Sequence, residues 1–112
     1  MPEINYQEII TTFNTYISKL ERGCIYIAHE MRNENKEILQ EIANFAEGIE
    51  WLIIMSRELK NVEIMPFLEE EKLVNYLKEI TEAIQREDFY LVADLFEYEI
   101  AEYFKNPVLI EG

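Results

Sequence analysis

The chain has few of the residues that interrupt or cross-link small proteins. Its 112 residues include three glycines, three prolines and a single cysteine, Cys24. So few glycines and prolines exclude an all-β protein, which would need many tight turns. One cysteine excludes an intramolecular disulfide and indicates a reducing compartment. We therefore expect helices that are held together by an apolar core alone.

Positive charge is also scarce, because ten lysines and arginines oppose 23 aspartates and glutamates, for a formal net charge of −13. This balance repels phosphate groups, so neither nucleic acid nor an anionic membrane is an expected partner. No apolar run is longer than Trp51–Met55, which is far too short to cross a membrane. The segment Met1–Tyr6 lacks the basic and apolar regions of a signal peptide. The expected location is the cytoplasm.

Apolar residues follow the spacing of helices that pack along a bundle seam. They alternate at spacings of four and three from Tyr6 to Met31, and the alternation resumes from Ile38 to Leu59. The predicted helices cover residues 5–32, 35–59, 67–86 and 88–105, with Pro66 in the first turn of the third. The fold class is therefore all-α: one domain over residues 1–112, forming an antiparallel up-down four-helix bundle with two long helices before two shorter ones.

Two glycines lie inside the long helices, where each costs up to about 1 kcal/mol relative to alanine. A short connection at residues 33–35 would bring Gly23 and Gly48 to within about one turn of each other along the interface. Our hypothesis is that they let the two backbones approach closely, or that they make room for Phe45 and Tyr16. The alternative is that both are tolerated without a role.

The fourth predicted helix is apolar on nearly every side, so it is either central to the bundle or shared with a second chain. A homodimer is therefore one expectation. Glu99 falls between Val92 and Leu95 on a regular helical wheel, inside the apolar arc. This position makes Glu99 a candidate buried carboxylate, although a boundary position in contact with water fits the pattern too.

No pattern of catalytic or metal-binding residues stands out. The sole histidine, His29, is not part of the Glu-x-x-His pairs that dinuclear metal bundles use, because residue 26 is Tyr26. The Glu-x-x-Glu pairs, such as Glu47 with Glu50, are what chance spacing gives in so acidic a chain. We expect no enzyme activity, no catalytic residue, no metal site and no cofactor.

Binding is better supported than catalysis, because apolar residues outnumber the positions that a bundle core can bury. The second helix is apolar on every face around Trp51, and both the 60–67 connection and the 107–112 tail are unusually apolar. The candidate partner-binding residues are Trp51, Ile54, Met55, Met65, Phe67 and Leu109. The connection and the tail could equally pack on their own bundle.

The leading interpretation is a non-enzymatic interaction protein, of an adaptor or chaperone-like kind, that binds a protein partner or forms a homodimer. The alternative is a bundle that binds a small molecule or a lipid in a cavity lined by Trp51, Met55 and Phe96. These two interpretations differ in where the apolar surface lies, on the outside or around an internal space.

Two segments, Gly48–Leu52 and Asp88–Ile100, resemble a family of small uncharacterised helical proteins from clostridia and related Firmicutes. The resemblance implies a helical fold and carries no activity or site residue. The length and helical layout are also similar to those of flagellar export chaperones of the flagellin-binding type. The N-terminal signature of those chaperones is not evident in this sequence, so the likeness is one of topology.

Overall fold

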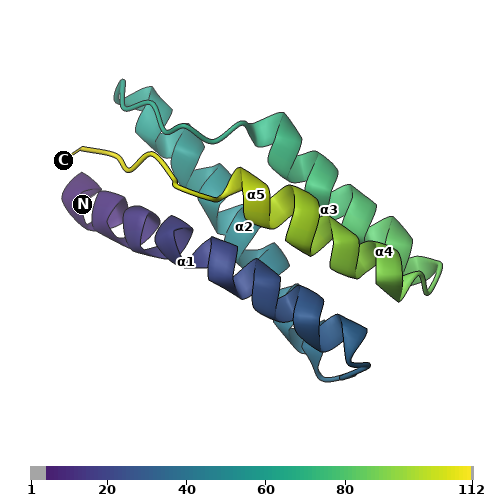
Figure 1. Cartoon of the computed structure of the whole chain (residues 1–112). Helices are drawn as coiled ribbons and strands as arrows, with labels where there is room; N and C mark the ends of the chain where they lie inside the picture. The colour runs from purple at the N-terminus through teal and green to yellow at the C-terminus, as the bar shows by residue number, and fades with distance from the viewer. Residues whose placement is uncertain (1–4, 112) are drawn as a thin grey trace.

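A computed structural model describes residues 5–111, and within that range the chain forms four helical segments and no strand (Figure 1). Two long helices come first, α1 (Tyr6–Arg32) and α2 (Ile38–Asn61), and α3 (Glu70–Gln85) follows. The fourth segment is continuous but changes its winding, as α4 (Phe89–Asp94), η1 (Leu95–Ile100) and α5 (Ala101–Tyr103). The all-α, four-helix prediction is confirmed. The N-terminal residues on which the signal-peptide argument partly rests lie outside the described range.

The predicted seam of α1 is its buried face. The side chain of Asn5 accepts a hydrogen bond from the backbone N–H of Glu8 and caps the helix at its start. The residues that repeat at four and three then turn inward, and those buried are Ile10, Phe13, Ile17, Leu20, Cys24, Ile27, Ala28 and Met31. The periodicity of the sequence therefore gave both the extent of this helix and the face that it buries.

Helix α2 returns along α1. The ring centroid of Trp51 lies 6.4 Å from that of Phe13 and 6.5 Å from that of Tyr16.

The two interior glycines, Gly23 on α1 and Gly48 on α2, differ in their surroundings. A Cβ built on Gly48 would lie 1.7 Å from the hydroxyl oxygen of Tyr16, whereas one on Gly23 would meet nothing within 4 Å. Gly48 therefore makes room for Tyr16, as one form of the hypothesis held. The hypothesis is wrong for Gly23, because that position faces solvent.

The connection between α2 and α3 is longer than predicted, and Pro66 is not in the first turn of α3. Helix α3 begins at Glu70, after an extended stretch in which Leu68 is buried. The backbone N–H of Glu69 donates a 2.9 Å hydrogen bond to the hydroxyl of Tyr103, which holds this stretch against the fourth segment. Burial of apolar residues in the connection delays the start of the helix.

The fourth segment packs against two of the other helices, α1 and α3. It packs against α1 along its whole length, and α3 also contacts its α4 and η1 portions. Asp88 caps its start as predicted, with a side-chain oxygen that accepts a hydrogen bond from the N–H of Leu91. Part of its apolar surface stays exposed, since Phe89 is 39%, Tyr98 65% and Tyr90 76% exposed.

The middle of this segment is a π-helix, which the sequence analysis did not predict. Val92, Phe96, Ile100 and Phe104 are all fully buried, at a constant spacing of four residues. In an α-helix such a row would rotate steadily away from the core, because one turn takes 3.6 residues. The wider turn of a π-helix restores the alignment, and all four side chains stay on the inner face.

Candidate functional site

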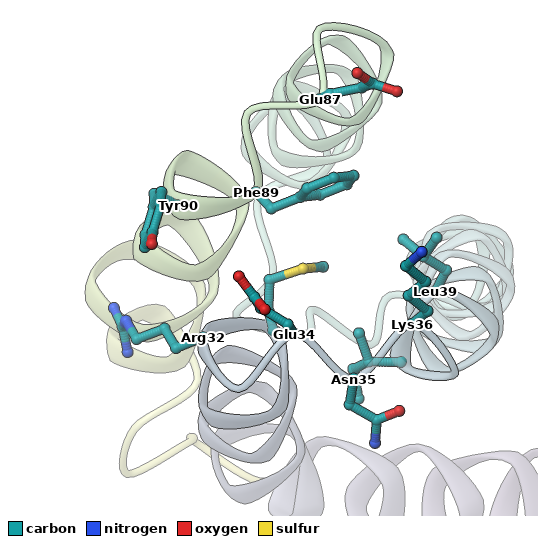
Figure 2. Close-up of a pocket in the computed structure, with 10 residues that line it drawn as sticks. Arg32, Glu34, Asn35, Lys36, Leu39, Glu87, Phe89 and Tyr90 are labelled. Carbon is teal, nitrogen blue, oxygen red and sulfur yellow. The ribbon is translucent and has the colours of Figure 1, made fainter.

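One end of the bundle contains an open cavity of about 430 Å³ between the α1–α2 turn and the α3–α4 turn. We call it the end cavity. Figure 2 shows the ring of Phe89, from the start of α4, on the same side of the view as Leu39 on α2, while Glu34 on the α1–α2 turn lies on the side of Arg32. Its lining residues are Met31, Arg32, Glu34, Asn35, Lys36, Ile38, Leu39, Glu87, Phe89 and Tyr90. The cavity therefore has apolar walls and a charged rim.

One of the two positively charged side chains on that rim, Arg32, is already paired with carboxylates. The guanidinium of Arg32 pairs with Asp94, at 2.9 Å, and with Glu97, and it lies 5.7 Å from the ring centroid of Tyr98. The hydrogen bond from Arg32 lowers the pKa of the Glu97 carboxyl. By contrast, neither Glu34 nor Glu87 has an ion-pair partner within residues 5–111.

A second concave surface, of about 360 Å³, lies between α2 and α3. We call it the α2–α3 groove. It is lined by Leu39, Ile42, Ala43, Phe45, Ala46, Glu50, Leu77, Ile80, Thr81 and Ile84. Leu39 lines both the groove and the end cavity, so the two form one continuous surface. At the far end of α2, an ion pair between Arg57 and Glu70 joins the two helices.

The groove exists because α2 presents small side chains to α3. Ala43 and Ala46 stand where larger residues would close the gap between the helices. The fourth segment contacts α3 but leaves this outer side of the bundle open. Exposed apolar side chains extend the same surface. Leu39 is 39% exposed and, about one turn beyond the lining residues, Ile54 is 52% and Val74 48% exposed. Helical spacing places Val74 on the face of Leu77 and Thr81.

The six predicted partner-binding residues divide into two groups. Trp51, Met55 and Phe67 are half-buried and pack against the core, so they belong to the bundle itself. Ile54, Met65 and Leu109 are exposed, but Met65 is in the α2–α3 connection and Leu109 in the C-terminal tail. Of these three exposed residues, Ile54 alone is on a helix that lines the α2–α3 groove.

Of the two positions that the sequence left open for Glu99, buried or in contact with water, the structure has the second, because this side chain is exposed. The helical wheel that placed it in the apolar arc assumed a constant α-helical turn. Glu99 lies in the π-helix η1, whose wider turn changes the direction of the residues that follow Val92. Its charge still acts on the neighbouring core: burial raises the pKa of Tyr76 to about 12, and the negative charge of Glu99 adds to that rise.

The C-terminal tail folds back on α1, which was one of the two alternatives for it, through a polar contact that apolar patterning did not predict. The side-chain amide of Asn14 donates a 2.9 Å hydrogen bond to the carbonyl of Ile110 and accepts one of 2.9 Å from its N–H. This pair of bonds satisfies both backbone groups of one extended residue. Of the tail's apolar residues, Ile110 is half-buried, while Val108 and Leu109 remain exposed.

The residues with reactive side chains lie apart. Cys24 is fully buried, and desolvation raises the pKa of its thiol to about 12, which keeps it protonated and unreactive. His29 is exposed and its Nε2 lies 3.1 Å from the amide nitrogen of Asn33. No group of three or more histidine, cysteine or acidic residues in the described range is placed to hold a metal ion. Within the same range, every helix is too short or too polar to cross a membrane.

Comparison with known proteins identifies a family and no individual relative. The family model described as a domain of unknown function, DUF8042, matches residues 8–106. No curated protein and no solved structure matches the chain. The matched region runs from the first turn of α1 to the end of the fourth segment, and it includes the end cavity and the α2–α3 groove. The chain therefore belongs to the DUF8042 family, whose function is unknown.

Proposed function

We propose that this protein is a non-enzymatic helical adaptor that binds a protein partner on the continuous surface formed by the α2–α3 groove and the end cavity. The observation that carries the proposal is the open apolar groove between α2 and α3, beside the packed core of the bundle. Concave surfaces of this kind bind the apolar face of a helix in many protein–protein complexes. A setting in the cytoplasm of clostridia and related Firmicutes is part of the proposal.

The residues that line the groove and the end cavity support binding over catalysis. Catalytic sites need titratable groups that converge in a cleft, with pKa values shifted by their surroundings. The groove is lined by one charged residue, Glu50, and the cavity rim carries charges at the ends of flexible side chains. This surface is suited to hold an apolar side chain, and it offers no pair of groups arranged to transfer a proton.

Photo-crosslinking in the native cell tests the proposal. Benzoylphenylalanine would replace Leu39, which lines the groove and is 39% exposed, or Ile25, a residue of α1 that is 47% exposed and does not line it. We expect discrete crosslinked proteins from position 39 and none of them from position 25. Adding Ala43→Lys should remove the products, because it places a long charged side chain in the groove. Products that are the same at both positions, or that survive Ala43→Lys, would contradict the proposal.

The volume of the end cavity favours a second candidate, the binding of a small molecule or lipid. About 430 Å³ falls in the range of ligand pockets, roughly 300–1,000 Å³. Trp51 and Phe96 do not line it, so the cavity differs from the one expected from the sequence. A neutral apolar dye such as Nile red tests this candidate: saturable binding at one dye per chain, lost in Phe89→Ala, would support it. Unsaturable binding, or binding that Phe89→Ala leaves unchanged, would exclude it.

A further inference from the structure

We infer that the occupant of the α2–α3 groove is an amphipathic helix of a basic protein partner, about three turns long, with one large apolar side chain placed in the end cavity. The inference rests on the proposed function and adds the chemistry of the partner to it. Three observations favour this occupant over others: the shape of the groove, the negative charge around it, and the placement of the C-terminal tail on α1.

The shape of the groove matches a helix. Its lining residues on α2 run from Leu39 to Glu50, a distance of about 17 Å at ~1.5 Å per residue. A helix of about eleven residues, or three turns, has the same length. The ion pair of Arg57 with Glu70 bridges the helices beyond one end, and the end cavity opens at the other. The partner helix therefore has a defined length and a defined position for its largest apolar residue.

The charge around the groove favours a basic partner. Glu50 lines it, Glu47 follows on the exposed side of α2, and Glu34 and Glu87 stand at the end cavity. Within the described part of the chain, the ion pairs leave all four of these carboxylates uncompensated. Lys36 at the cavity and Lys78 on the outer side of α3 oppose them, so the local excess is negative, as is the chain's net charge of −13. Lysines or arginines flanking an apolar helix face would complement this surface.

Residues 5–111 supply no better occupant. Within them, the C-terminal tail is held on α1 by the two hydrogen bonds between Asn14 and Ile110. A second copy would bring a surface of the same negative sign, with a net charge of −13 on each chain, and like charges across an interface oppose association. A basic helix satisfies both the apolar groove and the acidic rim.

Calorimetric titration of the full chain with three synthetic peptides tests the inference. All would be fourteen residues long; two share one leucine-rich helical face and carry either lysine or glutamate on their flanks. The third has the composition of the lysine peptide in a scrambled order without an apolar face. We expect the lysine peptide to bind at least tenfold more tightly than either of the others, because only it meets both features of the groove.

Two matched variants locate the binding. Ala43→Lys adds a charge inside the groove, and Asn44→Lys adds the same charge at an exposed α2 position that does not line it. The first should weaken the lysine peptide at least tenfold and the second less than threefold. Circular dichroism melts confirm that both variants are folded.

The outcomes separate the inference from the proposed function. Equal binding of the glutamate peptide, still lost in Ala43→Lys, would overturn the basic partner and leave a helix-binding groove in place. Equal binding of the scrambled peptide would show attraction by charge alone and overturn the inference. No binding of either amphipathic peptide would overturn both. A dimer in light scattering that Ala43→Lys converts to a monomer would make a second copy the occupant and overturn the inference.

Discussion

The interior glycines of the two long helices give opposite predictions for the same substitution. Gly23 is exposed on α1, and a Cβ there meets nothing within 4 Å. Gly23→Ala should therefore stabilise the protein by about 0.5–1 kcal/mol, the cost of a helical glycine relative to alanine. For a domain of this size, that gain corresponds to a rise in Tm of roughly 2–4 °C.

Gly48→Ala gains the same stability from helix propensity, but we expect it to lose more stability through packing. Its Cβ would lie 1.7 Å from the hydroxyl oxygen and 2.5 Å from the adjacent ring carbon of Tyr16, so the ring must leave its site. The displacement gives up the edge contact between Tyr16 and Trp51, worth about 0.5–1.5 kcal/mol, together with the burial of half a ring, worth about 1–1.5 kcal/mol. The net expectation is a loss of about 1 kcal/mol, once the propensity gain is subtracted.

Urea titrations followed by circular dichroism measure both changes, and a Tyr16→Ala background supplies the control. Without the ring, Gly48→Ala should stabilise that background by as much as Gly23→Ala stabilises the natural chain. If Gly48→Ala stabilises the natural chain by the same amount, Tyr16 does not constrain the position and the packing argument is refuted. If Gly23→Ala destabilises it, the open surroundings assigned to Gly23 are wrong.

Three further predictions follow from local features. Asn14→Ala should lose the two hydrogen bonds to Ile110 and speed hydrogen exchange at that amide at least tenfold, whereas unchanged exchange would refute the anchor. Glu63→Gly should raise the free energy of unfolding by about 0.5–1 kcal/mol in urea titrations, because Glu63 has a left-handed backbone (φ 62°) that glycine adopts without strain; a decrease would refute this. Burial raises the pKa of the Cys24 thiol from 9.0, and that of the Tyr76 hydroxyl from 10.0, to about 12, so the unfolded chain loses these protons more readily. The stability that they contribute is present below about pH 9 and falls between about pH 9 and 12, so urea midpoints that stay constant over that range would contradict it.

The sequence predicted those parts of the fold that depend on regular α-helical periodicity. The burial of α1 and α2 followed the alternation of four and three, because each turn of an α-helix takes 3.6 residues. The helical wheel that placed Glu99 in the apolar arc failed where that periodicity is broken by the π-helix. The constant spacing from Val92 to Phe104 was a signal of the wider turn, and it was visible in the sequence.

The candidate site could be predicted only in part. Ile54 was recognised as an apolar residue in excess of the core, and it extends the α2–α3 groove. The groove itself depends on which sides of α2 and α3 the fourth segment leaves uncovered, and that is set by packing between elements distant in the sequence. The Asn14 anchor was missed for a similar reason: a polar residue at a helix surface shows no periodicity that relates it to Ile110, 96 positions away.

Amide chemical-shift mapping during titration with the lysine peptide tests most directly whether the α2–α3 groove is the binding surface. We predict that the largest shifts occur at Ala43, Ala46 and Thr81, which line the groove, and at Phe89 in the end cavity. Amides around Asn14, on the side of the tail, should change little. Largest shifts around Asn14 and the tail, or shifts spread evenly over all four helical segments, would contradict the claim.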